Sequence, residues 1–327
     1  MSYVINGTKS VTPEKRQRVL DIIEKTGYQP NIVAKTLRTK KSNSVGVLAE
    51  DILGFSTARI INGISEYMEN TDYHILLNDL RMLDSLYDKY DQIIHQKDKI
   101  NKALSFLIHG AKVDAVIYVG MFDRDVSGII PNINKPVIVA YSTSKDAHTG
   151  FVTYDNEVVS EEMIDYLLGA GHSRIAVITG TMNTPPVQLR FKGIYKALDR
   201  AGLKLDESLV KIGDWGRDSG YNCTKELLSG NALPTAIFAM NDFMAIGAMD
   251  AIREAGLRVP QDISVTGFDN RSVADIVYPR LTTAEIDLKA IGFTAAEMVA
   301  SRLANIGQDT HERRIIIPSN IILRDSV

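Results

Sequence analysis

The chain has 327 residues, of which 45% are hydrophobic and 24% charged, a composition typical of globular proteins and a length sufficient for two hydrophobic cores. It contains one cysteine, so an intrachain disulfide is excluded and a cysteine-based metal site is not expected. No apolar run is long enough to span a membrane and the N-terminus lacks a signal-peptide pattern, so we expect a cytoplasmic protein without membrane contact.

The net charge of −3 is distributed unevenly along the chain. Residues 1–41 carry nine Lys or Arg against three acidic residues, whereas the remainder carries 28 basic and 37 acidic residues. A small basic segment before an acidic body is typical of a nucleic-acid-binding module, because neutralisation of phosphates supplies most of the nonspecific affinity. A solvated basic tail would have the same charge, so charge alone leaves both interpretations open.

The first predicted element is a helix that begins after Thr12. Thr12 supplies the N-cap, Pro13 stands at the first helical position and Gly27 follows the last turn. Its apolar stripe is too small to form a core without partner helices. A second short helix is predicted from Asn31, and the polar run KKSNS resembles a linker, which places a domain boundary near residue 43.

Beyond this linker, short β-branched runs alternate with long amphipathic stretches. In the first half the predicted strands are 44–49, 73–78, DAVIYVG and PVIVAY, and the predicted helices are 56–71 and about 92–109. The pattern restarts after a break near Phe151, with strands RIAVITG, LVKIGD, TAIFAM and ISVTGF and helices 156–170, 187–202, 219–229 and 242–256. Repeated strand–helix–strand units imply parallel sheets, so the predicted fold class is α/β with two doubly wound lobes.

Two such lobes place a ligand in the cleft beyond the carboxyl ends of their strands. Neither GTKSV at residue 7 nor GTMNTPP at residue 180 matches a phosphate-binding glycine loop, so we expect no nucleotide and no other cofactor. The six histidines are scattered without metal-ligand spacing, and no serine lies in a nucleophile motif. We therefore expect neither a metal site nor a catalytic residue.

Several sequence blocks, taken in order, point to one family. They are VTPEKRQRVLDIIEKTGYQPNIVAKTLRTKKSNSVGVL near the N-terminus, LGAGHSRIAVITG at 168, RFKGIYKAL at 190, AMNDFMAIGAMDAIREAGLRVPQDISVTGFDN from 239 and PRLTTAEIDLKAIG from 279. Together they resemble the lactose/galactose repressor family of bacterial transcription regulators. The resemblance implies two lobes of the type I periplasmic-binding-protein-like kind behind a remnant helical DNA-binding headpiece.

The domain boundaries expected from this resemblance are as follows. Residues 1–43 form a partial helix-turn-helix headpiece and a hinge helix. Residues 44–153 with 287–313 form the N-terminal effector-binding lobe. Residues 154–286 with 314–327 form the C-terminal effector-binding lobe.

The resemblance also implies contacts to operator DNA. Leu37 matches the hinge leucine that, in the family, wedges between base pairs in the minor groove, although an ordinary apolar helix residue is the alternative. The other DNA-contact positions that it implies are Tyr3, Asn31, Ala34, Lys35 and Arg38. Family members begin roughly 18 residues earlier, with the helices that read the major groove. We therefore expect DNA binding to be weakened or lost in this chain, and we hypothesise that Met1 is a misassigned start.

Predicted effector contacts in the second lobe come from the family resemblance and from strand ends. Arg190 matches the family's sugar-binding arginine, with a helix-surface salt bridge as the alternative, and Asp269 follows an apolar strand, where it can accept bonds from two hydroxyls. Asn241 and Asp242 end another strand, although either one can instead cap the following helix. Trp215 aligns with an aromatic residue that stacks on the sugar in some members, and core packing is its alternative.

The same rule gives five candidates in the first lobe. Glu50 and Asp51 end the opening strand with Phe55 after them, and Tyr141 and Ser142 end another strand. Glu50 differs from the small polar residue of the lactose repressor, so the identity of the effector does not carry over.

The resulting hypothesis is a sugar-responsive transcriptional repressor whose effector, a mono- or disaccharide, changes operator affinity from the cleft. By resemblance we expect a homodimer with contacts from apolar helix faces near 56–71 and 241–256. One alternative is a sugar-binding protein without a DNA-binding role. Another is a cleft hydrolase or kinase that uses Asp155, Asp242 or Asp269 as a general base.

Overall fold

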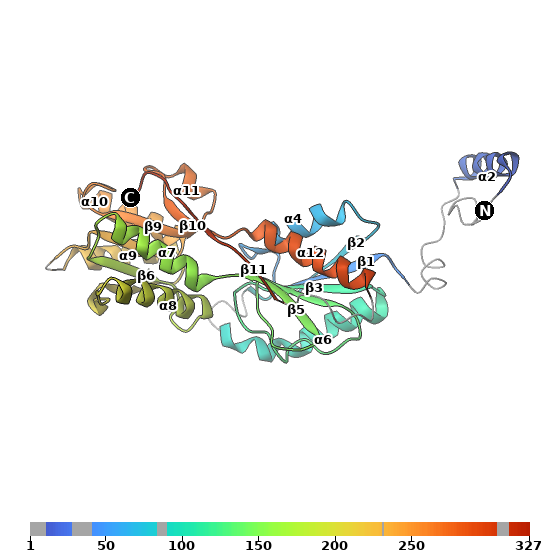
Figure 1. Ribbon diagram of the computed structural model, residues 1–327, viewed down its shortest axis with the longest axis horizontal. Coiled ribbons are helices and arrows are strands. Elements are labelled where there is room, and N and C mark those ends of the chain that lie inside the picture. Colours follow the sequence, from blue (N-terminus) through green and yellow to red (C-terminus); the bar gives the residue numbers. More distant parts are fainter. Residues whose placement is uncertain (1–10, 28–40, 84–89, 231, 306–313) are drawn as a thin grey trace. The chain divides into compact units, whose positions relative to one another are not determined.

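The structure, a computed structural model, describes residues 11–27, 41–83, 90–230, 232–305 and 314–327 (Figure 1). The chain divides into two units, Met1–Asn43 and Ser44–Val327. The second predicted helix lies outside the described residues, as do the positions predicted to contact DNA, which are Tyr3, Asn31, Ala34, Lys35, Leu37 and Arg38.

The first unit contains helix α2 (Pro13–Thr26), which has the boundaries predicted from the sequence. Thr12 precedes it in a non-helical conformation. Gly27 ends it in the left-handed conformation, with φ of 59°, and its N–H donates to the Ile23 carbonyl. No residue of α2 is buried in the described part of the chain, so packing contributes little to the stability of this helix.

The first lobe of the second unit contains a six-stranded sheet in the order β11-β5-β4-β3-β1-β2. All neighbouring strands in it are parallel. The strands are β1 (Ser44–Ala49), β2 (His74–Asp79), β3 (Ala115–Val119), β4 (Val137–Ala140), β5 (Thr149–Tyr154) and β11 (Arg314–Ile317).

Helices cover both faces of this sheet. Helices α4 (Thr57–Met68) and α12 (Leu288–Ala304) lie together on one face, and α6 (Lys97–Ser105) covers the other (Figure 1). Along β1, Val47 and Ala49 belong to the core beneath α4 and α12, whereas Leu48 belongs to the core beneath α6. The strands are therefore apolar on both faces, which explains their continuous hydrophobic runs in the sequence.

The second lobe contains a six-stranded sheet in the order β12-β10-β9-β8-β6-β7. Only its edge pair β10–β12 is antiparallel. The strands are β6 (Ile175–Thr179), β7 (Val210–Ile212), β8 (Ala236–Ala239), β9 (Ser264–Asp269), β10 (Thr282–Glu285) and β12 (Asn320–Ile322). The helices are α7 (Asn156–Gly169), α8 (Pro185–Arg200), α9 (Arg217–Leu228), α10 (Asp242–Glu254) and the short α11 (Val273–Ile276).

Three chain segments connect the two lobes within the described residues. They run from β5 to α7, from β10 to α12 and from β11 to β12 (Figure 1). Helix α12 follows a strand of the second sheet but packs on β3, β4 and β5 of the first. After the second lobe the chain therefore returns to the first lobe to form α12 and β11, and then returns to the second lobe to form β12.

The predicted fold class, α/β with two doubly wound lobes, is confirmed. Three details differ from the prediction. The break placed near Phe151 falls inside β5, a strand that the sequence pattern did not reveal. Residues 314–317, expected in the second lobe, form β11 and pair with β5 in the first sheet. The helix expected at about 92–109 is a 3₁₀ segment (Tyr90–Gln96), then α6, then one π turn (Phe106–Gly110).

None of the helices in the described ranges has both the length and the apolar character needed to cross a membrane.

Candidate ligand-binding site

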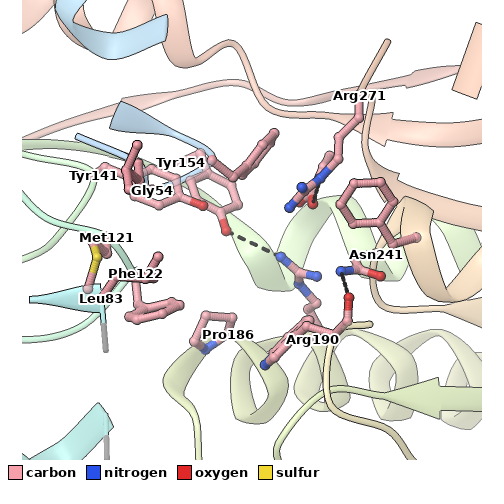
Figure 2. Close-up of a pocket in the computed structure, with 15 residues that line it drawn as sticks. Gly54, Leu83, Met121, Phe122, Tyr141, Tyr154, Pro186, Arg190, Asn241 and Arg271 are labelled. Atoms are coloured by element: carbon pink, nitrogen blue, oxygen red, sulfur yellow. Dashed lines mark hydrogen bonds and ion pairs between the residues drawn. The ribbon is translucent and has the colours of Figure 1, made fainter. Parts of the chain in front are cut away.

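A cavity of about 240 Å³ lies in the cleft between the two lobes (Figure 2). It is lined by Leu53, Gly54, Phe55, Leu83, Met121, Phe122, Tyr141, Tyr154, Pro186, Arg190, Trp215, Asn241, Phe243, Asp269 and Arg271. Most of these residues end a strand or follow one within a few positions, in both sheets. The cavity is therefore located where open α/β sheets bind ligands.

Six of the ten predicted effector residues line this cavity, namely Phe55, Tyr141, Arg190, Trp215, Asn241 and Asp269. The other four, Glu50, Asp51, Ser142 and Asp242, are not among its lining residues. They are buried and bonded behind the walls of the cavity, as the following contacts show.

Arg190 projects from α8 and is 3% exposed. Its Nε donates to Asn156 Oδ1 at 2.9 Å, its Nη2 donates to the Tyr154 hydroxyl at 3.3 Å, and its Nη1 donates to the Met240 carbonyl. Its guanidinium carbon lies 3.4 Å from the centre of the Phe268 ring. All three of these hydrogen bonds go to neutral groups, so Arg190 is a fixed buried cation and does not form the helix-surface salt bridge that was its alternative role.

Asp269 ends β9 at the cavity in a strained backbone conformation, with φ of 110°. Its Oδ2 accepts a hydrogen bond from Arg271 Nε at 3.1 Å. Burial raises the pKa of Asp269, although Arg271 and Arg190 act in the opposite direction. The carboxylate therefore lies between two cations with little access to water.

Arg271 was not predicted from the sequence. Its guanidinium carbon lies 3.7 Å from the ring centre of Phe55 in the first lobe and 4.5 Å from that of Phe243 in the second. The available signal was its position two residues beyond Asp269, just past the end of the strand. Its contact with Phe55 joins the two lobes across the cleft.

Asn241 and Asp242 have different roles. Asn241 caps α10 by accepting a hydrogen bond from Met244 N at 2.9 Å, and it also lines the cavity. Asp242 accepts from the Thr283 hydroxyl at 2.5 Å and from Arg271 N at 2.6 Å. Burial and the neighbouring Asp269 raise the pKa of Asp242 to about 7. Asp242 therefore stabilises the turn that carries Arg271 and does not line the cavity.

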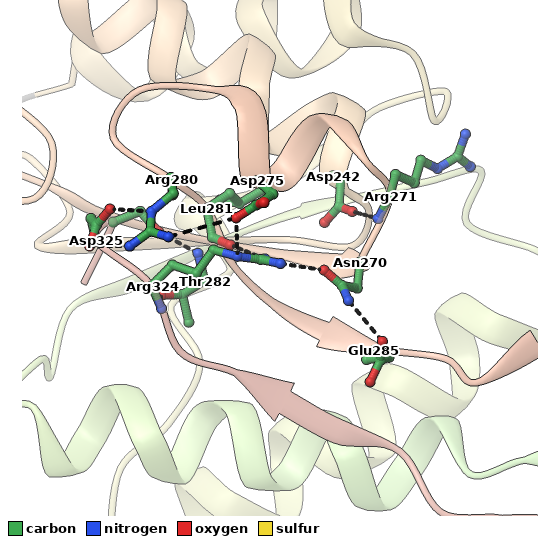
Figure 3. A network of polar contacts seen from close by, with 11 residues as sticks. Asp242, Asn270, Arg271, Asp275, Arg280, Leu281, Thr282, Glu285, Arg324 and Asp325 are labelled. Atoms are coloured by element: carbon green, nitrogen blue, oxygen red, sulfur yellow. Dashed lines mark hydrogen bonds and ion pairs between the residues drawn. The ribbon is translucent and has the colours of Figure 1, made fainter.

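The turn after β9 is further fixed by residues distant in the sequence (Figure 3). Asn270, in the left-handed region with φ of 49°, accepts from Arg324 Nη2 at 2.8 Å and donates to Glu285 Oε1 at 2.8 Å. Arg324 also donates to the Leu281 carbonyl at 2.8 Å. The C-terminal segment and the end of β10 thus hold the backbone on which Arg271 stands.

Trp215 both packs on the core and lines the cavity. It has a left-handed backbone conformation, with φ of 72°, and its carbonyl accepts from Asn241 Nδ2 at 2.9 Å. Its ring lies over Gly180, where a Cβ atom would approach the ring to 1.9 Å. Trp215 therefore packs on the core, as one interpretation expected, and its position at the cavity leaves stacking on a sugar as a prediction.

Glu50 was expected at the cleft but is fully buried in its own lobe. It accepts from the Tyr118 hydroxyl at 2.5 Å and from Met121 N at 2.9 Å, and it forms an ion pair with Arg124. Met121 and the adjacent Phe122 line the cavity. Glu50 therefore shapes this wall from behind.

Asp51 and Ser142 support other parts of the same wall. Asp51 accepts from Leu53 N and from Leu83 N, both at 2.8 Å, and these two leucines line the cavity. The Ser142 hydroxyl donates to the Phe122 carbonyl at 2.8 Å. These two residues therefore order the first-lobe loops, with their polar groups bonded to backbone.

A second buried carboxylate, not predicted from the sequence, connects the lobes behind Arg190. Asp123 of the first lobe accepts from Thr153 Oγ1 at 2.9 Å and from Asn156 Nδ2 at 2.8 Å. Asn156 begins α7 of the second lobe, and its Oδ1 accepts from Arg190. Burial raises the pKa of Asp123 to about 6. A continuous chain of hydrogen bonds therefore runs from the first lobe to the cavity.

Residues 164–327 match the family described as periplasmic binding protein-like domain. Over its whole length the chain is 31% identical to catabolite control protein A of Priestia megaterium and covers 94% of that protein. It is 30% identical to the HTH-type transcriptional regulator DegA of Bacillus subtilis, with 100% of this chain and 93% of DegA covered.

Solved structures show the same architecture. The Lac repressor bound to ONPG in its repressed state superposes with a TM-score of 0.80 at 24% identity, covering 100% of this chain and 94% of that chain. The Escherichia coli transcriptional repressor ascG gives a TM-score of 0.72 at 26% identity, covering 87% and 98%.

The two-lobed fold, the cleft and these relatives define a transcriptional regulator with a periplasmic-binding-protein-like ligand domain. The chain belongs to the lactose/galactose repressor family, which confirms the resemblance found in its sequence.

Proposed function

We propose that the protein is a sugar-responsive transcriptional repressor in which a small polyhydroxylated effector binds in the cleft and changes the affinity for operator DNA. The observation that carries this proposal is the arrangement of three buried polar side chains, Arg190, Asn241 and Asp269, around one cavity. Arg190 supplies donors in a fixed position, and Asp269 supplies an acceptor, the combination that vicinal hydroxyls require. The rings of Trp215 and Tyr141 offer faces for the apolar side of a sugar.

The size of the cavity favours a monosaccharide over a disaccharide. Its volume of about 240 Å³ lies below the range of roughly 300–1,000 Å³ that is usual for drug-sized ligands. A ligand of this size would contact both lobes at once, because first-lobe and second-lobe residues line the same space.

An effector in the cleft would act through the angle between the lobes. It changes DNA affinity only to the extent that it binds one arrangement of the lobes more tightly than the other. The proposal includes operator contacts by Leu37, Arg38 and the other headpiece positions. It also includes a homodimer. The apolar faces of α4 and α10 pack inside the subunit, on α12 and α9, so a dimer contact on these helices would use their other faces.

The contacts of the acidic residues favour binding over catalysis. Asp155 caps α7 by accepting from Glu157 N and Val158 N, and Asp242 is bonded behind the wall. Of the three candidate bases only Asp269 lines the cavity, where it pairs with Arg271. That the relatives are transcription regulators also favours this function over a sugar-binding protein without DNA.

Thermal unfolding in the presence of neutral and acidic monosaccharides tests the proposal. A sugar that binds the folded protein raises the melting temperature by mass action, and we expect Asp269→Asn to weaken this binding at least about tenfold. Asp199→Asn, an exposed change on α8, is the matched control and should leave the shift unchanged. In a mobility-shift assay with selected sequences, at protein concentrations high enough to detect weakened DNA binding, any sugar that shifts the melting temperature should also change the fraction of DNA bound. No response to any sugar would contradict the proposal.

A further inference from the structure

Arg271 has unused hydrogen-bonding capacity in the cavity. Its Nε is bonded to Asp269, but its Nη1 and Nη2 make no hydrogen bond to any residue in the described part of the chain. Its side chain is 19% exposed and contacts the rings of Phe55 and Phe243. A guanidinium packed on aromatic rings offers its remaining N–H groups in its own plane, the geometry that suits bidentate acceptors.

The position of Arg271 is built into the fold. Its backbone N–H donates to the buried Asp242, and the preceding Asn270 is held by Arg324 and Glu285 (Figure 3). In Figure 2 the guanidinium groups of Arg190 and Arg271 approach the same space from different sides. Arg271 is thus a hydrogen-bond donor whose position at the cavity is fixed by the fold, unlike a surface arginine that moves freely in solvent.

The charge of the cavity is positive. Among its lining residues two guanidinium groups, Arg190 and Arg271, face a single carboxylate, Asp269. Behind the walls, burial and the neighbouring Asp269 raise the pKa of Asp242 to about 7, which reduces its negative charge near neutral pH. A buried excess of positive charge is costly unless an anion compensates it.

We infer that the ligand of this cleft is an acidic sugar, one that carries a phosphate or carboxylate group, and that Arg271 binds that group while Arg190 and Asp269 bind the sugar body. The inference rests on the proposed function and narrows its ligand class. The shared chemistry is an oxyanion with at least two acceptor oxygens in one plane, which phosphate and carboxylate both supply.

Melting temperatures with matched pairs of ligands test this inference. The neutral members are glucose and ribose, and the acidic members are glucose 6-phosphate, ribose 5-phosphate, gluconate and glucuronate, all at equal concentration and ionic strength. We expect at least one acidic sugar to raise the melting temperature more than its neutral parent. The phosphorylated and oxidised members distinguish the two sources of the anion. Inorganic phosphate is tested alone, and a shift equal to that of the sugar phosphates would overturn the role of the sugar body.

The variant Arg271→Gln tests whether Arg271 binds the anionic group of the ligand. Its affinity for the acidic sugar should fall about 10- to 100-fold, whereas its affinity for a neutral sugar should change less than about threefold. Arg258→Gln, a change in an exposed arginine paired with Asp262, is the matched control and should keep the wild-type response. An unchanged response of Arg271→Gln to acidic sugars would overturn the assignment.

The outcomes separate this inference from the proposed function. If neutral sugars raise the melting temperature as much as their acidic counterparts, the inference fails and the sugar-responsive function stands. If sugars of neither set raise it, the proposed function itself is contradicted.

Discussion

Two carboxylates at strand ends show how neighbouring side chains decide the role of a residue. Glu50 follows β1 and Asp269 ends β9, so both were expected at the cleft. Arg124 and the Tyr118 hydroxyl bond Glu50 inside its lobe, whereas Asp269 faces the cavity and Arg271. Strand-end position selects the edge of the sheet, but side-chain direction depends on partners that only the folded chain brings close.

Asp123 gives a prediction for the pH dependence of stability. Burial raises its pKa to about 6, above the ordinary value of 3.8. Between these values the folded protein keeps a proton that the unfolded chain releases, so the free energy of unfolding falls as pH rises. Asn cannot titrate, so Asp123→Asn is the reference. Relative to it, the free energy of unfolding of the wild type should fall by about 3 kcal/mol between about pH 4 and about pH 6.

Urea unfolding of both proteins across this pH range measures the difference. Groups that titrate in both proteins cancel in the comparison, so the difference isolates Asp123. A difference in unfolding free energy that stays constant with pH would show that Asp123 does not titrate as expected.

At the scale of elements, two glycines set the distance between α4 and α12. A Cβ atom on Gly63 would lie 2.0 Å from the Lys289 carbonyl oxygen, and one on Gly292 would lie 1.9 Å from the Ile60 carbonyl oxygen. Both contacts are with backbone, which cannot move aside without shifting a helix. The two helices therefore touch along their backbones over the first sheet.

Gly292→Ala should destabilise the protein by about 1–3 kcal/mol, because the added methyl group forces these helices apart. Gly169→Ala is the control: the space around Gly169 at the end of α7 is open, so this change should be neutral or stabilising by up to about 1 kcal/mol. Chemical denaturation of the two variants compares them. Equal losses of stability would mean that general helix effects, and not the close crossing, account for the result.

The sequence pattern predicted the central strands of each sheet, but it did not predict which strands pair with one another. The central strands β1, β3, β6 and β8 are apolar runs buried on both faces, so their strand character is visible locally. Strand β5 contains Gly150 and three polar or hydroxyl side chains, which obscured it. The membership of β11 in the first sheet depends on its pairing with β5, a contact between distant parts of the chain that no local pattern encodes.

The residues of the site divide in the same way, into those that a local pattern predicts and those that depend on distant contacts. Arg190, Asp269 and Asn241 were found through family blocks and strand ends, and they line the cavity. Arg271 was missed because its position at the cavity depends on Phe55 of the other lobe and on a turn held by Arg324. The connection of Asp123 to Arg190 likewise runs through hydrogen bonds of Asn156, which is distant from both in the sequence.

At the scale of the whole molecule, the cavity belongs entirely to the unit Ser44–Val327, since every lining residue lies within it. We therefore expect a chain that begins at Ser44 to fold and to give the same ligand-induced shift in melting temperature as the full chain. Helix α2 has no buried residue in the described structure, which is the physical reason for this expectation. Calorimetric melting of both chains with the same sugar makes the comparison, and a lost response in the shorter chain would contradict it.

The chain contains a single tryptophan, and that residue is Trp215 in the wall of the cavity, with its ring centre 5.8 Å from the guanidinium carbon of Arg190. All indole emission from the protein therefore originates at the cleft. A ligand that enters must change the polarity and the quenching groups around this one fluorophore. Occupancy can consequently be followed optically in the unlabelled wild-type protein, without a background signal from indoles elsewhere.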